Sequence, residues 1–432
     1  MEEDNSEQKP WYEDPFIQEM MGLMGARAMR SVMAGFKANL VFSGENGIAD
    51  ATKYMDQSLY DNEKRILVIT DNFTKKFLPK MEDAFSNTNF EIKLWEGVKA
   101  EVPYETIEKG VQICKEFNPT ILMAIGGGSV MDTAKIVNIK YEKPELNLLN
   151  IDAVSGSIGL HRKIKHLVAI PTTIGTGSEV TTAAVLNDTR RAPHKKIGIT
   201  ADDILPTIVI LHPDFVKDLP PFLIMGTGLD TFAHAMGAYV SNWNNPLTTA
   251  INITAIKETL QYLPRLVKYG SKDLEGWEHM QWAALMAGLG FSNSMPGIEH
   301  ALGHSFGALM EVHHGYSVGL FTPQSVAWQA KVTERWRDLC PIFEVEDKQM
   351  SRQKALESLI ENIQTFIRKV GGAVAVREVK RPIIKEEDYK TKIPLMAEYA
   401  LNDIAHLASY RPLRLENYLN IYKSAWNGEI IY

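Results

Sequence analysis

The sequence of 432 residues contains only two cysteines, Cys114 and Cys340, which lie far apart in the chain. A disulfide framework needs more cysteines than this, and so does a structural zinc site made of four thiolates. Both are therefore excluded, and the protein must fold around an ordinary apolar core.

Three further features are missing. No apolar run reaches the roughly 18 residues that a membrane span requires. The start, MEEDNSEQKPWYEDPF, is acidic, whereas a secretory signal has a basic start and an apolar stretch. No basic block is present and the net charge is −7, so the electrostatic pattern of a nucleic-acid binder is absent. We therefore expect a soluble cytoplasmic protein with a small-molecule substrate and with neither nucleic-acid nor membrane partners.

The composition is that of a globular protein, with 45% apolar and 23% charged residues. Residues 1–35 stand apart as an N-terminal extension, an acidic tail followed by a methionine-rich helical pattern. We interpret this helix as a cover for a core edge or a subunit interface, and a methionine-lined lid over an apolar substrate is the alternative.

The rest of the chain changes character near residue 219. Between residues 36 and 218, β-branched runs alternate with helical patterns, which predicts an α/β domain with a parallel or mixed sheet covered on both faces. From residue 219 to 432 strand patterns nearly vanish, so we expect an all-α domain packed on the first. The predicted strands lie at 39–44, 65–71, 90–96, 119–128, 166–172 and 206–213, with helical patterns at 51–59, 73–86, 104–117 and 129–141 between them.

Two glycine- and hydroxyl-rich turns follow predicted strands. Gly126 to Ser129 come directly after one strand and open a helix, so that glycines allow close approach of a phosphate and the helix N-terminus offers free N–H groups. The second turn spans 171–179. Two such turns at one edge of a sheet favour a pyrophosphate-bearing cofactor over plain strand-to-helix turns. Asp71, at the end of another strand, fits either an adenosine ribose, where it would repel a 2′-phosphate, or a helix N-cap.

Histidines cluster in one short segment, since four of the eleven fall between His300 and His314. His300 and His304 are four residues apart, hence on one helical face, and Asp230 and His234 repeat that spacing on another predicted helix. One carboxylate with three imidazoles is a sound ligand set for Fe²⁺ or Zn²⁺.

Geometry leaves two arrangements open for these histidines. An unbroken helix would place His300 and His314 roughly 21 Å apart, whereas ligands of one metal lie about 3–4 Å apart. If both bind, the helix must break between them, and Gly307 or the segment 311–315 would allow it. The alternative is the pair His300 and His304 alone, as in other i, i+4 metal pairs.

Taken together, these segments resemble the iron-containing (group III) alcohol dehydrogenase family. The matching motifs are GGGSVMDTAK, AIPTTIGTGSEVT, GLDTFAHAMGAYVSNWNNPLT, EHALGHSFGALMEVHHG and RPLRLENYLNIYKSAW, in the expected order from about Phe36 to Asn427. The resemblance implies an N-terminal dinucleotide-binding domain, a C-terminal helical domain, and a metal and cofactor in the cleft between them. It also implies NAD, Fe²⁺ (with Zn²⁺ possible by its ligand chemistry) and a homodimer or larger homo-oligomer.

The resemblance also assigns residues. Asp71 matches the position whose carboxylate goes with NAD preference, and Lys196 matches a lysine near the cofactor riboses. His304 matches a histidine that does not usually ligate the metal, and we assign it as the proton relay because imidazole titrates near neutral pH. The implied metal ligands are Asp230, His234, His300 and His314, and the implied pyrophosphate-binding residues are Gly126, Gly127, Gly128, Ser129, Asp132, Thr172, Thr173 and Thr176.

Three positions depart from the family pattern. Gly237 stands where glutamate is commoner, and His212 stands where aspartate is usual. His313 replaces a usual proline, so it is an alternative to His314 as the last ligand.

The sequence therefore predicts a metal-dependent, NAD-linked alcohol dehydrogenase, in which the metal polarises the substrate oxygen and hydride passes to NAD. The alternative is an NAD- and metal-dependent lyase resembling dehydroquinate synthase. A sugar-phosphate substrate would require a basic cluster near the metal, and the segment 226–315 offers only Lys257, Arg265, Lys268 and Lys272 on the helix after Asn245. A binding protein that has lost its chemistry predicts a broken ligand set, and all four candidates are present.

Overall fold

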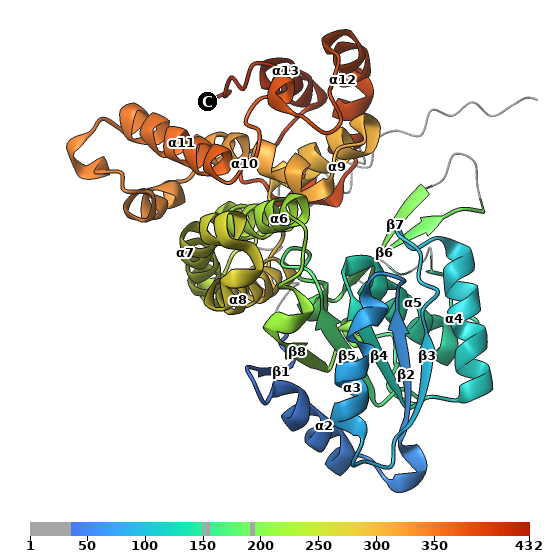
Figure 1. Ribbon diagram of the computed structural model, residues 1–432. Coiled ribbons are helices and arrows are strands. Elements are labelled where there is room, and N and C mark those ends of the chain that lie inside the picture. The colour runs from blue at the N-terminus through green and yellow to red at the C-terminus, as the bar shows by residue number, and fades with distance from the viewer. Residues whose placement is uncertain (1–35, 149–150, 152–155, 191–194) are drawn as a thin grey trace, which may run out of the picture.

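The computed structural model describes residues 36–148, 151, 156–190 and 195–432. The N-terminal extension, 1–35, lies outside the described residues. The first half of the described chain is built around a sheet, and the second half is helical (Figure 1). This order of an α/β unit followed by an all-α unit confirms the predicted fold class.

The sheet has six strands, all parallel, in the order β1-β8-β5-β4-β2-β3. Every residue of β4 is buried, as a β-branched and apolar run at the centre of a parallel sheet requires. All six predicted strands are confirmed. They are β1 (Leu40–Ser43), β2 (Arg65–Thr70), β3 (Glu91–Trp95), β4 (Ile121–Gly126), β5 (His166–Pro171) and β8 (Ile208–Leu211).

Alternate residues of the strands enter two separate cores. Met123 packs in one core with Met55 and Met81 from the helices on that face. Its neighbour Leu122 packs in the other core with Cys114. The covering helices are α2 (Gly47–Ser58) and α3 (Leu78–Phe85) on one face and α4 (Tyr104–Phe117) and α5 (Gly128–Glu142) on the other.

The carboxyl ends of the three central strands lie side by side. Thr70 of β2 pairs with Ile125 of β4, and Gly126 pairs with Pro171 of β5. The segments that follow Thr70, Gly126 and Pro171 therefore leave the sheet at one edge, as the sequence predicted.

A two-stranded antiparallel ribbon interrupts the βα alternation, and the sequence analysis missed it. It consists of β6 (Ala183–Asp188) and β7 (Lys195–Thr200). Buried and partly exposed residues alternate along β6, because one side of the ribbon covers α5 and the other faces outward.

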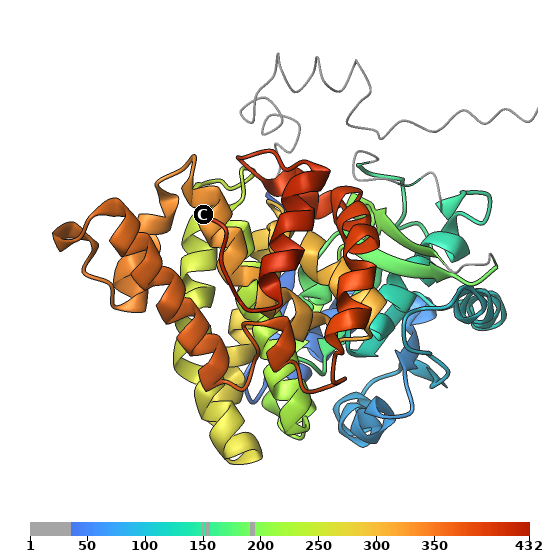
Figure 2. The same cartoon turned by 90° about the horizontal axis from the view of Figure 1, so that it is seen from above.

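The second half is helical throughout, in agreement with the prediction. Its central helix is α6 (Pro221–Val240), which is buried on all sides from Gly226 onward and packs against α7, α8 and α10. The helices of this half, yellow-green to red, lie at the left and in front, with much of the blue-to-green sheet half at the right and behind them (Figure 2). The others are α7 (Pro246–Tyr269), α8 (Leu274–Ser292), α9 (Ile298–Met310), α10 (His314–Ala330), α11 (Arg352–Lys369), α12 (Glu386–Leu401) and α13 (Leu415–Ala425). Among the described helices, none has the length and apolarity needed to cross a membrane.

Candidate active site

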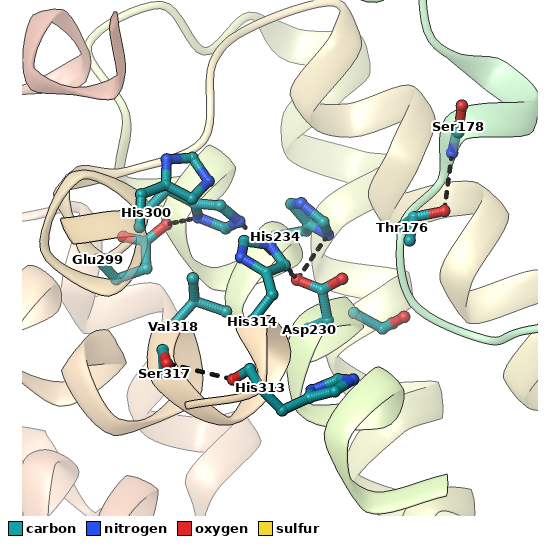
Figure 3. A network of polar contacts seen from close by, with 12 residues as sticks. Thr176, Ser178, Asp230, His234, Glu299, His300, His313, His314, Ser317 and Val318 are labelled. Carbon is teal, nitrogen blue, oxygen red and sulfur yellow. Dashed lines mark hydrogen bonds and ion pairs between the residues drawn. The ribbon is translucent and has the colours of Figure 1, made fainter. Parts of the chain in front are cut away.

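Four side chains converge between helices α6, α9 and α10. Asp230 and His234 lie one turn apart on α6, His300 lies in the first turn of α9, and His314 begins α10 (Figure 3). One ligand atom from each residue lies within 4.8 Å of the other three. We call these four residues the metal cluster. The four side chains, which lie in separate sequence motifs, therefore surround one point in the folded chain.

A helix break brings His314 to this point. Helix α9 ends at Met310, Glu311 adopts a left-handed conformation with φ 56°, and α10 begins three residues later. The break lies in the segment 311–315, one of the two places that the sequence analysis allowed. His304, one turn beyond His300, lies outside the metal cluster, so the alternative pair of His300 with His304 does not form the four-atom group.

His313 points elsewhere. Its ring packs edge-on against Phe222 at 5.5 Å between centroids, and its Nδ1 lies 2.8 Å from where a Cβ on Gly226 would be. In Figure 3 the ring of His314 faces Asp230, whereas His313 is directed to helix α6. The geometry therefore favours His314 over His313 as the fourth ligand.

Three of the four residues of the metal cluster are buried, and His314 is exposed. Oδ1 of Asp230 lies 3.2 Å from Nε2 of His314, 3.7 Å from Nδ1 of His234 and 3.9 Å from Nε2 of His300. Within the described chain, Asp230 Oδ1, His234 Nδ1 and His300 Nε2 have no hydrogen-bond partner. Buried polar atoms without partners are costly, so this donor set fits a divalent cation bound at the common point.

Electrostatics hold the cluster in a metal-ready protonation state. Burial lowers the pKa of His234 to about 3 and that of His300 well below its usual value, so both rings are neutral near pH 7. Burial opposes ionisation of Asp230, but the surrounding histidines, led by His234, outweigh it and hold the pKa of Asp230 well below its usual value. Neutral imidazoles and an ionised carboxylate are the ligand forms that a cation requires.

The two loops at the sheet edge form a second candidate site, which we call the glycine–threonine loops (126–129 and 172–178). A Cβ on Gly127 would lie 3.3 Å from Cγ2 of Thr173, and one on Gly128 would lie 3.1 Å from Cγ2 of Thr176. The loops therefore touch through positions that lack side chains. The buried hydroxyl of Thr173 has no partner in the described chain. Helix α5 starts here, so its N-terminal N–H groups and this hydroxyl fit a pyrophosphate.

Other predicted residues of these loops act within the protein. Asp132 accepts hydrogen bonds from Ser178 Oγ (2.7 Å) and from Val185 N (3.0 Å), and it thereby ties α5 to the second loop and to the ribbon. Thr172 donates its N–H to the carbonyl of Gly126. Ser129 Oγ accepts from the N–H of Glu101 at 3.3 Å. These contacts fix the shape of the loops.

Asp71 and Lys196 remain candidates for the ribose end of the cofactor. Asp71 Oδ1 accepts the N–H groups of Phe73 and Thr74, both at 2.8 Å, and so caps the short helix η3 (Thr74–Phe77). The cap predicted as an alternative is therefore present. Lys196 lies in β7 paired with Asn187, but its side chain lies outside the described part of the chain.

The loops and the metal cluster meet directly. Thr231 of α6 donates its hydroxyl hydrogen to the carbonyl of Ile174 at 2.7 Å, and a Cβ on Gly177 would lie 2.6 Å from Cα of Gly288 in α8. The second loop is thus packed on α6, which carries Asp230 and His234, and on the neighbouring helix α8.

Sequence reasoning missed three residues beside the cluster. Phe291 stacks on the ring of His234 at 4.2 Å between centroids, Glu299 contacts His300, and Asp403 contacts His304. Glu299 had a signal, an acidic residue directly before a candidate ligand. Asp403 had none, because it lies 99 residues from its partner in a helical stretch without a motif.

Comparisons with known proteins show the family. Residues 39–213 match the profile described as iron-containing alcohol dehydrogenase, and residues 224–426 match that of the Fe-containing alcohol dehydrogenase family, C-terminal. The chain is 30% identical to an NAD-dependent methanol dehydrogenase of Bacillus methanolicus over 366 residues, 84% of this chain and 92% of that protein. It is 29% identical to an NADPH-dependent butanol dehydrogenase of Clostridium saccharobutylicum over 369 residues, 85% of this chain and 92% of that protein. An iron-containing alcohol dehydrogenase from Thermococcus thioreducens is 28% identical and has a TM-score of 0.78 over 91% of this chain and 100% of that chain.

These matches cover both halves of the molecule and agree with the motifs, the sheet and the helical unit. They confirm the predicted dehydrogenase class and give no support to the lyase alternative. The chain therefore belongs to the iron-containing alcohol dehydrogenase family, whose members are NAD(P)-dependent oxidoreductases that use iron to interconvert alcohols with aldehydes or ketones.

Proposed function

We propose that the metal cluster holds one divalent cation and that this chain oxidises an alcohol, or reduces the matching aldehyde or ketone, beside it. The observation that carries the proposal is the convergence of four ligand atoms within 4.8 Å, three of them buried without a hydrogen-bond partner in the described chain. A cation at this point supplies Lewis acidity to the substrate oxygen, and NAD supplies the hydride acceptor. Fe²⁺ and Zn²⁺ both suit one carboxylate and three imidazoles.

We propose that the glycine–threonine loops bind the pyrophosphate of NAD through Gly126, Gly127, Gly128, Ser129, Thr172, Thr173 and Thr176. Asp132 holds the two loops together through Ser178. Asp71 faces the adenosine ribose, where its negative charge disfavours a 2′-phosphate, and Lys196 lies near the cofactor riboses. Phe291 lies between the two sites, because it stacks on His234 and its ring edge would be 3.4 Å from a Cβ on Gly177.

We propose His304 as the proton relay. Its Nδ1–H donates to Oδ2 of Asp403 at 2.7 Å, which leaves Nε2 as the nitrogen that accepts a proton. Its ring stacks on that of His314 at 5.1 Å, and 43% of its side chain is exposed, so a proton taken from the alcohol has a route to water.

The test is turnover on a panel of primary alcohols, diols and aldehydes with NAD or NADH. Metal-stripped protein is assayed under argon before and after addition of Fe²⁺ or Zn²⁺. We expect activity that depends on the added metal ion. The carbon-chain length of the alcohol that is oxidised fastest then indicates the class of substrate. Absence of turnover with every pair, while metal and NAD are bound, would contradict the proposal.

We further propose that the protein forms a homodimer or larger assembly and is located in the cytoplasm. We also propose that the chain consists of two domains with a boundary near residue 218. Both outer strands of the sheet carry exposed apolar side chains, Leu40 on β1 and Ile92 and Leu94 on β3, which favours association. Cys114 and Cys340 are free and buried, which suits a reducing compartment. Light scattering of the purified protein, in which a monomer would contradict the assembly, tests the first point.

A further inference from the structure

One buried carboxylate next to the metal cluster belongs to neither the ligand set nor the proton relay. Glu299 is fully buried and directly precedes His300 in the first turn of α9. Its Oε1 lies 2.9 Å from Nδ1 of His300 and also accepts the N–H of Gly297 at 2.8 Å. The hydroxyl of Ser325 is a further neighbour of this carboxyl group. A carboxylate in such surroundings is expensive to bury, and a helix cap alone would need only one of its contacts.

The protein leaves room for this carboxylate by omitting two side chains. A Cβ on Gly237 of α6 would lie 1.9 Å from Oε1 of Glu299, and a Cβ on Gly297 would lie 2.2 Å from Oε2. Both distances are far shorter than any real contact, so a larger residue at either position would displace the Glu299 carboxylate. At Gly237 it would also press on the backbone nitrogen of Gly297, at 2.6 Å. Gly237 is one of the positions at which the sequence departs from the resembling family, and the structure gives the departure a physical reason.

The direction of the hydrogen bond decides what Glu299 does. As a neutral ligand that faces the metal cluster through Nε2, His300 carries its proton on Nδ1 and donates it to Oε1 of Glu299. The lone pair of His300 then lies on Nε2, the atom that lies 3.9 Å from Oδ1 of Asp230 in the metal cluster. A carboxylate behind a ligand histidine fixes the tautomer and the ring orientation and makes the facing nitrogen more basic.

We propose that Glu299 is the positioning residue of the metal site, which holds His300 with its Nε2 lone pair toward the cation in the space that Gly237 leaves open. This inference rests on the proposed function, since it assumes that the cluster binds metal. Glu299 touches neither substrate nor cofactor, and it acts through His300 alone.

The experiment measures metal dissociation constants by competition with a chelator, on the full chain. Outer partners of ligand histidines typically change metal affinity by about 10–100-fold. We expect Glu299→Ala to weaken Zn²⁺ and Fe²⁺ binding by a factor in this range. Glu299→Gln keeps an acceptor for Nδ1–H of His300 and should recover most of the affinity. Gly237→Ala, which expels the carboxylate without removing it, should weaken binding as Glu299→Ala does.

The matched control is Glu179→Ala, which removes another buried carboxylate, in the sheet half of the molecule. It should leave metal affinity unchanged, and circular dichroism of each metal-free variant shows whether it is folded. Wild-type affinity in Glu299→Ala, or an equal loss in Glu179→Ala, would overturn the inference. If the wild type itself fails to bind one cation per chain, the proposed function fails instead, so the two failures are distinguishable.

Discussion

The glycine–threonine loops and the metal cluster are built on opposite principles. In the loops, side chains largely satisfy one another. Asp132 is bonded to Ser178 and to the ribbon, and Lys135 donates to Ser178, Thr181 and the carbonyl of Ala183. In the metal cluster, three buried ligand atoms have no hydrogen-bond partner in the described chain and face mainly one another. The loops therefore have a defined shape without a ligand. The metal cluster, in contrast, has buried polar atoms that only a bound cation would satisfy.

The same difference explains what the sequence could predict. Each loop is one contiguous segment that follows a strand, so its glycine and hydroxyl residues can be recognised directly in the sequence. The metal cluster joins three helices, and spacing alone could not choose between a broken helix and the pair His300 and His304. The choice needed the turn at Glu311, where a left-handed residue ends α9.

Contacts between distant segments could not be predicted at all. Asp403, which follows helix α12, contacts His304 on α9. Gly237 on α6 lies against Glu299 on α9. Neither pair has a local sequence pattern, because only the packing of α6, α9 and the C-terminal segment brings its members together. The ribbon of β6 and β7 was missed because its short strands do not fit the βα alternation around them.

The largest effect is expected from Asp230→Asn. Removing the charged member of a buried polar group costs roughly 3–5 kcal/mol, which for metal binding is on the order of 10²–10⁴-fold in affinity. Metal analysis of the purified variant and chelator competition measure the loss. NAD binding should persist, since the loops are untouched. A variant that retains wild-type metal content would contradict the assignment of Asp230.

Gly127→Val probes the other region. The added side chain meets Thr173, and overpacking of this kind costs about 1–3 kcal/mol. It also enters the space that a pyrophosphate would approach. We expect NADH affinity, measured by fluorescence titration, to fall roughly 5- to 150-fold. Metal content should stay at the wild-type level. Unchanged NADH affinity would contradict the placement of the cofactor.

In the metal-free protein, acid should act with opposite signs through two buried groups, His234 of the metal cluster and Glu179 directly after the second loop. The pKa of His234 is lowered to about 3 by burial, so between pH 6.5 and 3 only the unfolded chain binds this proton, and acid lowers the free energy of unfolding. Burial raises the pKa of Glu179 to about 7, so between pH 7 and 4.5 the folded chain holds this proton, and acid raises that free energy. Each proton contributes about 1.4 kcal/mol per pH unit.

Urea unfolding from pH 7 to 5 separates these contributions. His234→Gln should reduce the loss of stability in acid, whereas Glu179→Gln should increase it. Two variants with the pH dependence of the wild type would contradict the protonation states described above.

The smallest effect is expected from Asp71→Asn. The amide oxygen still caps η3 through the N–H groups of Phe73 and Thr74, but the negative charge is gone. We expect the ratio of kcat/KM for NAD over NADP to fall about tenfold, equivalent to ~1.4 kcal/mol. Asp83→Asn, an exposed acid on α3, is the control and should leave the ratio unchanged. A ratio that Asp71→Asn leaves at the wild-type value would assign Asp71 to the cap alone.

The most direct test of the central claim is a metal titration of stripped protein followed by thermal unfolding. A cation that binds only the folded chain stabilises it by about 4 kcal/mol at a thousandfold excess over Kd. We expect one cation per chain and the full rise in Tm for the wild type and for Gly127→Val. At the same cation concentration Asp230→Asn should gain at most about 1.4 kcal/mol, because its affinity is at least about 100-fold lower. If the cation stabilised Asp230→Asn as much as the wild type, or did not bind the wild type stoichiometrically, the metal cluster would not be a cation-binding site.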